Sequence, residues 1–130
     1  MNTEQLTYQF EQGIPGFEHL NDFVFEEVGN ELPMKLMKAS EDETISLLVA
    51  SPFLFYPDYE WELPETVKQE LSINGEEDVE VWSVITISTD FANATINLLA
   101  PIILNKRTLA GKQLILHDNT YSSRAPLNRT

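Results

Sequence analysis

The residues of this chain that could do acid–base or nucleophilic chemistry are few. Its 130 residues include no cysteine, and His19 and His117 are the only histidines. Neither histidine has a partner histidine at the spacing of a metal site. Without cysteine there is no thiol nucleophile, no thiolate metal ligand and no disulfide framework. We therefore predict no metal and no other cofactor.

Two arrangements resemble catalytic sites without their supporting features. His117-Asp118 and the serine pair Ser122-Ser123 could be drawn as a triad, but the serines lie in a polar, proline-broken stretch with no strained nucleophile turn. Acidic clusters within residues 58–62 and 76–78 occupy polar positions, whereas a catalytic carboxyl group needs burial to raise its pKa. We predict that the protein is not an enzyme and has no small-molecule substrate.

The spaced glycines of Gly13-Ile14-Pro15-Gly16 could suggest a loop that holds a phosphate group. Glu11 and Glu18 flank this loop and no lysine follows it, so its electrostatics oppose an anion. We expect a structural turn here.

Charge is distributed unevenly along the chain. Residues 1–105 hold 20 acidic side chains against three lysines, a net charge of −17, whereas residues 106–130 hold five basic side chains against Asp118. Such an acidic body repels the phosphate backbone of nucleic acids and attracts basic proteins. The same charge could instead serve solubility alone. We expect no direct nucleic-acid partner.

The sequence also lacks the marks of membrane insertion and export. No apolar run approaches the roughly 18 residues that a membrane helix needs, and the first residues have neither the basic start nor the apolar stretch of an export signal. The absence of cysteine fits a reducing compartment. We expect a cytoplasmic protein with no membrane partner.

The elements that would position a binding surface are mostly short strands. Turn-forming residues separate strands of this kind, a pattern typical of an all-β, mainly antiparallel domain, either a small barrel or a sandwich. We predict one such domain over residues 1–118, followed by a polar tail over residues 119–130 that is mobile unless a partner orders it. Apolar patterns predict strands near residues 6–10, 23–26, 34–37, 45–50, 58–63, 79–87 and 111–116, with two more in the run 97–105.

One short α-helix is expected near residues 64–73. Pro64 suits the first helical position, and Val67 and Leu71 form its buried stripe. Asn74-Gly75 supplies the left-handed residue that ends it, which gives a helix of two to three turns.

The longest apolar run, residues 97–105, has Pro101 at its centre. Proline has no N–H to donate to a sheet ladder, so this run is not expected to form one regular central strand. We predict that it breaks into two short strands at a bulge or a sheet edge.

Three motifs along the chain carry a family resemblance. They are Gly13-Ile14-Pro15-Gly16-Phe17-Glu18, Ser51-Pro52-Phe53-Leu54-Phe55-Tyr56-Pro57-Asp58-Tyr59, and residues 97–105 with Gly111-Lys112-Gln113-Leu114-Ile115-Leu116. With these motifs, in the same order, the sequence resembles the FliW family of bacterial flagellar assembly factors over nearly the whole chain. The run 97–105 with the strand after it is the most specific part, and Leu104, where the family often has a β-branched residue, is a slight departure.

The resemblance implies a regulatory binding protein rather than a catalyst. Members of the family bind CsrA, an RNA-binding translational repressor, and prevent it from blocking flagellin translation; they also bind flagellin, which then frees the repressor. Such a protein either covers the RNA site of the repressor or docks beside it, and the resemblance favours the second mechanism. The alternative function is a dedicated flagellin export chaperone with no translational role.

We expect the partner-binding surface in two segments. In the first, Tyr59 is an amphipathic anchor beside acidic neighbours, although its alternation with Trp61 also fits a core position. In the second, Pro101 marks an open sheet edge at which an extended partner segment could pair, unless the proline only forms a bulge that closes the barrel. The residues expected at the interface are Asp58, Tyr59, Glu60, Asn97, Ala100, Pro101, Ile102 and Asn105.

Overall fold

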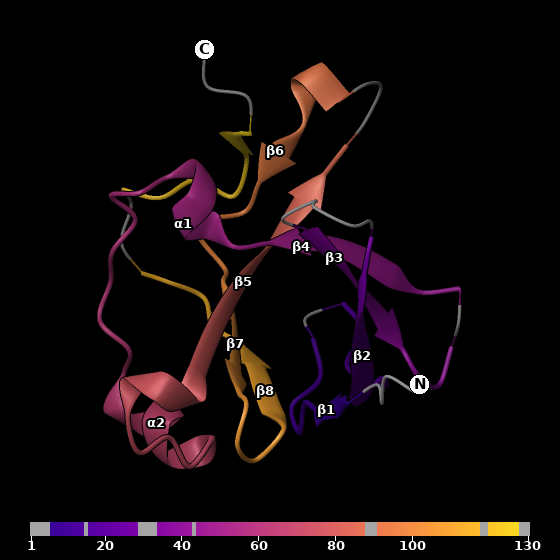
Figure 1. The fold of residues 1–130 in the computed structure, drawn as a ribbon, viewed down its shortest axis with the longest axis vertical. Coiled ribbons are helices and arrows are strands. Elements are labelled where there is room, and N and C mark those ends of the chain that lie inside the picture. Colours follow the sequence, from indigo (N-terminus) through magenta and orange to yellow (C-terminus); the bar gives the residue numbers. More distant parts are fainter. Residues whose placement is uncertain are drawn as a thin grey trace.

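Seven strands of the chain close into a mixed β-barrel, and two further short strands extend the sheet beyond it (Figure 1). The structure is a computed structural model that describes residues 6–14, 16–28, 34–42, 44–87, 91–117 and 120–127, with only the backbone of Phe91. Among these residues no helix has the length and apolar character needed to cross a membrane. The expected all-β fold, in its barrel form, is confirmed.

The sheet follows the order β4-β3-β2-β1-β8-β7-β5-β6-β9, and an additional pairing of β4 with β5 closes the barrel. All pairings are antiparallel except that of β1 with β8, which is parallel. The strands are β1 Thr7–Gln9, β2 Asp22–Glu27, β3 Met34–Ala39, β4 Ser46–Ala50, β5 Val79–Thr86, β6 Thr95–Ile96, β7 Ile102–Asn105, β8 Ala110–Gln113 and β9 Ala125–Pro126. The helices are α1 Pro52–Phe55 and α2 Glu65–Glu70, with single 3-10 turns η1 Glu76–Asp78 and η2 Phe91–Asn93.

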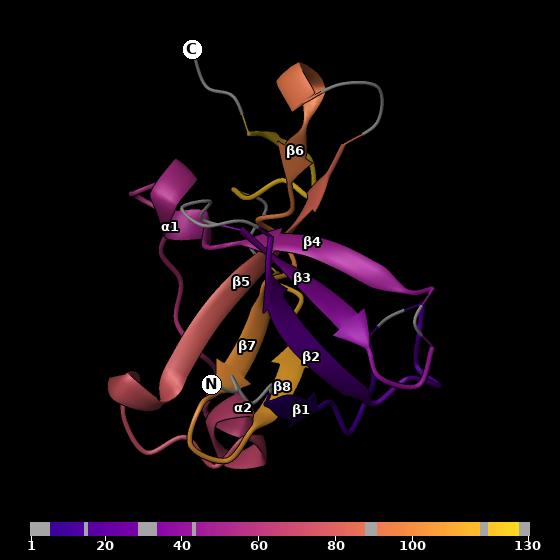
Figure 2. The same ribbon diagram turned by 45° about the vertical axis from the view of Figure 1, so that its right-hand side comes forward.

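The long β-branched strand β5 connects the barrel to its extension. Its first half pairs with β7, from Val79 opposite Asn105 to Trp82 opposite Ile102. Its second half pairs with β4 on one side and with β6 on the other, so that Ile85 lies between two neighbouring strands. Strand β5 therefore belongs both to the barrel wall and to the small sheet above it (Figure 2).

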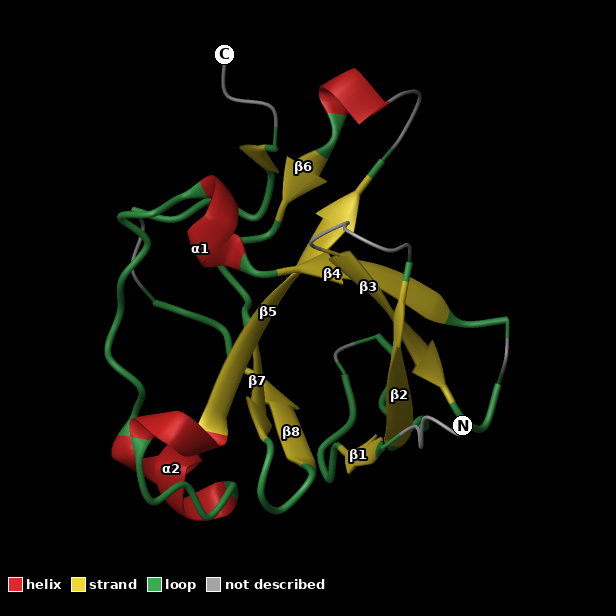
Figure 3. Cartoon of the chain, in the orientation of Figure 1, coloured by secondary structure: helices red, strands yellow, loops and turns green. Residues whose placement is uncertain are grey.

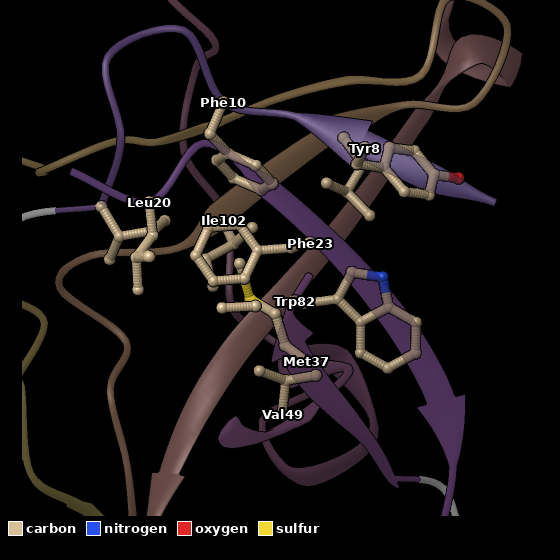
Figure 4. Close-up of a cluster of buried hydrophobic side chains, with 11 residues drawn as sticks. Tyr8, Phe10, Leu20, Phe23, Met37, Val49, Trp82 and Ile102 are labelled. Atoms are coloured by element: carbon tan, nitrogen blue, oxygen red, sulfur yellow. The ribbon is translucent and has the colours of Figure 1, made fainter. Parts of the chain in front are cut away.

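Aromatic and aliphatic side chains from several strands, and from the loop between β1 and β2, fill the barrel (Figure 4). The rings of Phe10 and Phe23 meet edge to face, with centroids 5.3 Å apart, and Phe10 is fully buried. Gly111 of β8 leaves the space for the Phe10 ring, because a Cβ at this glycine would lie 2.4 Å from the Phe10 Cζ atom. In the strand predicted near residues 6–10, Tyr8 and Phe10 are buried, whereas Leu6 is 49% exposed.

The helix predicted near residues 64–73 is present but shorter. Val67 and Leu71 are buried as expected, while Pro64 has ψ of 146° and precedes the first helical residue. The left-handed residue at its end is Ser72, with φ of 56°, and Gly75 is extended. Tertiary hydrogen bonds explain the early end, because the Asn105 amide donates to the carbonyls of Leu71 and Ser72.

The prediction of a strand over residues 58–63 is wrong. Helix α1 begins at Pro52, and the chain from there to α2 is irregular. The inside–outside alternation nevertheless holds, since Tyr59 is buried and Asp58 and Glu60 are exposed. An extended loop packed against the barrel produces the same period of two as a strand without any ladder.

The proline-broken run contains one strand of its own rather than two. Strand β7 begins after Pro101, and the preceding residues form a bend in which the Asn97 side chain accepts hydrogen bonds from the N–H groups of Leu99 and Ala100, both at 3.0 Å. Strand β7 lies between β5 and β8, so Pro101 does not mark a sheet edge. The bend replaces the expected first strand because the asparagine side chain satisfies the backbone locally.

The expected boundary between a domain ending at residue 118 and a free tail is not observed. Strand β9 pairs with β6, and Ala125 and Leu127 are buried in a second core outside the barrel. The Tyr56 hydroxyl also donates a hydrogen bond to the Pro126 carbonyl. Residues 120–127 therefore complete the fold, while residues 119 and 128–130 lie outside the described part of the chain.

Candidate functional site

The segment between α1 and α2 carries the first group of expected interface residues. It runs down one side of the molecule as a loop from one end of the barrel to the other (Figure 3). Asp58 and Glu60 point into solvent, and Tyr59 between them is only 4% exposed. The two carboxylates are thus available to a partner, whereas the aromatic ring is not.

Tyr59 belongs to the second core outside the barrel, the one that contains Ala125 and Leu127. Its hydroxyl donates a buried hydrogen bond of 2.7 Å to the Leu98 carbonyl, and its ring meets the Tyr121 ring edge to face with centroids 4.8 Å apart. Burial raises the pKa of the Tyr59 phenol above its ordinary value, and the nearby Trp61 side chain opposes this rise only in part. Tyr59 is therefore a core aromatic residue, as its alternation with Trp61 allowed.

Tyr121 fixes the backbone beneath Glu60. The Tyr121 hydroxyl accepts a hydrogen bond of 3.0 Å from the Glu60 N–H and donates one of 2.7 Å to the Glu60 carbonyl. The C-terminal segment therefore holds Glu60 so that its carboxylate faces outward. Sequence reasoning missed Tyr121 because residues 119–130 were expected to be mobile, and the only signal was an aromatic residue in an otherwise polar stretch.

Replacing Tyr59 with phenylalanine should lower the free energy of unfolding by about 1–2 kcal/mol, because the buried Leu98 carbonyl loses its donor. The phenol ionises more easily in the unfolded chain, so its contribution is complete below pH roughly 10 and is lost as the pH rises above that value. Urea unfolding at pH 8 and above pH 10 should show a smaller alkaline loss for the variant. Unchanged stability with weakened partner binding would instead make Tyr59 an interface residue.

The second group of expected residues is largely inside the fold. Pro101, Ile102 and Asn105 are fully buried, while Asn97 and Ala100 are half-buried. Ile102 pairs with Trp82 on one side and with Gln113 on the other, so no backbone edge is open here for an added strand. The expectation of an open edge at Pro101 is wrong, and the proline introduces a barrel strand.

Asn105 joins the β7–β8 turn to the end of α2. Besides its two donated bonds, its Oδ1 accepts hydrogen bonds from the N–H groups of Arg107, at 2.8 Å, and Thr108, at 3.3 Å. Arg107 in turn pairs with Asp78, where the Asn74 N–H foremost and also the Arg107 guanidinium hold the pKa of the carboxyl group below its usual range. Asn105 therefore has a structural role: its side chain holds the β7–β8 turn against the end of α2.

Asp58 and Glu60 belong to a larger acidic face formed by residues 58–78. This stretch contains eight acidic side chains and Lys68 as its one base. Seven of the eight are exposed, and Asp78 is the buried one. The exposed acids of the acidic face are Asp58, Glu60, Glu62, Glu65, Glu70, Glu76 and Glu77. The arrangement attracts a cationic surface.

Exposed apolar side chains lie next to the acidic face. Phe53 and Leu54 of α1 are 43% and 61% exposed, and the Phe53 ring lies with its centroid 5.6 Å from that of Tyr59. Among the described residues no group of three or more histidine, aspartate and glutamate side chains could hold a metal ion. The acidic face and the apolar side chains next to it are therefore suited to binding a protein with apolar and basic groups.

Comparison with known proteins identifies the family. A family profile described as FliW protein matches residues 1–127. The chain is 39% identical over 124 residues to the flagellar assembly factor FliW of Bacillus licheniformis, covering 95% of this chain and 87% of the relative. It is 36% identical over 124 residues to that of Bacillus subtilis, with the same coverages of 95% and 87%. For that of Clostridium kluyveri the identity is 41% over 118 residues, covering 91% of this chain and 81% of the relative.

A crystal structure titled as the flagellar assembly factor FliW has the same fold. It superposes with a TM-score of 0.91 at 30% sequence identity, and the match covers 100% of this chain and 92% of the other. The fold of this chain is therefore matched over its whole length. With sequence relatives, a family profile and a solved fold in agreement, this chain belongs to the FliW family of non-enzymatic flagellar assembly factors.

Proposed function

We propose that this flagellar assembly factor acts in the cytoplasm by binding a CsrA-type translational repressor and flagellin as competing partners. Bound to the factor, the repressor no longer blocks translation of the flagellin messenger RNA. The single observation that carries this proposal is the acidic face, with seven exposed carboxylates between residues 58 and 77. The family resemblance supplies the identity of the partners.

Electrostatics favour a partner that itself binds RNA. A repressor that holds RNA must present a basic surface, and complementary charge increases the rate at which two proteins find each other. The acidic face would also disfavour RNA close to the docked repressor, because phosphate groups and carboxylates repel one another. The factor docks beside the RNA site and weakens RNA binding by charge and coupling.

Partner exchange links this binding to the amount of flagellin. If flagellin and the repressor occupy the factor exclusively, accumulated flagellin frees the repressor and synthesis falls. Export of flagellin returns the factor to the repressor. By linkage, each partner must weaken the affinity for the other by the same factor.

Reversing two charges of the acidic face should weaken the repressor complex. For Asp58→Lys with Glu60→Lys we expect about tenfold lower affinity or more, chiefly through slower association. The matched control is Glu11→Lys with Glu27→Lys, which changes the net charge equally at exposed positions outside the acidic face. Isothermal titration at about 50 and about 300 mM salt measures the affinity and its dependence on ionic screening, and stopped-flow mixing measures the association rate.

Equal weakening by both double variants would mean that only net charge matters and would contradict a localised site. A second titration separates the two functions weighed from the sequence. Adding the factor to a repressor–leader RNA complex should release RNA, and flagellin should reverse the release. A factor that binds flagellin tightly but never releases RNA would be an export chaperone without a translational role.

A further inference from the structure

The chain after β8 forms an open sheet edge. The N–H groups of Leu114 and Leu116 donate to the carbonyls of Pro101 and Leu99, at 2.9 and 2.8 Å. Backbone groups of successive residues in an extended chain point to opposite sides, so those of Ile115 point away from residues 99–101. Within the described part of the chain, the Ile115 N–H and carbonyl have no hydrogen-bond partner.

The geometry of β1 explains why this edge is open. Strand β1 pairs with β8 only through Gln9 and Ala110 and then turns away, so β8 and the residues after it lose their neighbour on that side. The Ile115 side chain is 51% exposed. Exposed edges with apolar side chains readily accept a further strand, and proteins usually block them.

A groove borders this edge. It has a volume of about 590 Å³ and lies between the residues after β8 and the entry to α2. Trp61, Val67, Leu114 and Leu116 supply its apolar lining, and Ile115 forms part of its border. The groove thus offers apolar contacts next to unpaired backbone groups, which is the combination used in recognition of extended peptides.

Two acidic side chains line the groove. Glu62 and Glu70 of the acidic face line it, and Glu62 has no ion-pair partner among the described residues. The one lysine at the groove, Lys112, pairs with Glu70 at 3.0 Å and donates to Gln12 at 2.6 Å. An incoming segment therefore meets uncompensated carboxylate charge beside an apolar surface.

We propose that this groove binds an extended segment of the basic protein partner by strand addition to Ile115. The segment pairs its backbone with the Ile115 N–H and carbonyl. Its apolar side chains enter the groove over Trp61 and Val67, and its basic side chains lie beside Glu62. The proposal rests on the proposed function for the identity of the partner, the cationic repressor, and adds the place and mode of its binding.

Amide hydrogen exchange of the full chain with the purified repressor tests this mode directly. In the free protein the Ile115 amide should exchange fast, and in the complex it should be protected at least tenfold. Ile115→Lys should weaken the complex by about tenfold, because it places a cation where the basic segment binds. Ile87→Lys is the matched control and should leave the affinity unchanged, because Ile87 is 43% exposed, directly follows β5 and does not line the groove.

The outcomes are distinguishable. Repressor binding with an unprotected Ile115 amide overturns the groove assignment and leaves the proposed function standing. No repressor binding by the unmodified protein overturns both. Protection of Ile115 that depends on the concentration of the protein alone would show a second copy as the occupant, which also overturns the proposal.

Discussion

Replacing Phe10 with alanine should lower the free energy of unfolding by about 3–5 kcal/mol, the range for removing a large buried aromatic side chain. Phe10 is fully buried in the barrel core, where its ring meets that of Phe23 (Figure 4). The Phe10 ring also lies directly against Gly111. Each of these neighbours comes from a different strand or turn, so collapse around the cavity would require several strands to move. Equilibrium urea unfolding followed by tryptophan fluorescence measures the change.

The Gly111 contact makes this prediction specific. Gly111→Ala places a Cβ 2.4 Å from the Phe10 ring and should destabilise the protein by about 1–3 kcal/mol through overpacking. In the Phe10→Ala background the same substitution meets empty space and should cost much less. A double-mutant cycle that proves additive would contradict the packing of Phe10 against Gly111.

Replacing Asn105 with alanine should lower the free energy of unfolding by about 2–4 kcal/mol, because the N–H groups of Arg107 and Thr108 lose their acceptor and the carbonyls of Leu71 and Ser72 each lose one of two donors. The amide serves the carbonyls of Leu71 and Ser72, and Oδ1 serves the N–H groups of Arg107 and Thr108. Thermal and urea unfolding measure the loss. The exposed neighbour Lys106 is the control, and its replacement by alanine should change stability by less than about 0.5 kcal/mol.

The same variant decides between a structural and an interface role for Asn105. The folded fraction of Asn105→Ala should bind the repressor with unchanged affinity, because the side chain does not reach the surface. A stable variant that fails to bind would place Asn105 in the interface after all.

Four barrel strands were predictable because short runs of apolar and β-branched residues mark them. Strands β2 to β5 lie close to their expected positions, since such runs favour strands that pack against a core. The buried stripe of α2 was visible for the same reason. The end of α2 was not, because the Asn105 amide, more than thirty residues later in the chain, binds its last carbonyls.

The candidate site shows the same division between local and distant causes. Exposure of Asp58 and Glu60 followed from the sequence, and so did the open alternative that Tyr59 is a core residue. The position of Pro101 inside the barrel depends on which strands flank β7, and Tyr121 acts through a contact 61 residues away. The edge at Ile115 arises because β1 is short, which no pattern in residues 111–116 reveals.

The parallel pairing of β1 with β8 also bears on how the chain acquires its shape during synthesis. Gln9 pairs with Ala110, so one hundred residues separate the two sides of this seam. The barrel cannot close until β8 has emerged from the ribosome. A chain truncated before that point would expose aromatic side chains that are buried in the barrel core of the complete fold. Such long-range closure slows folding, because a large loop must be ordered before the contact forms.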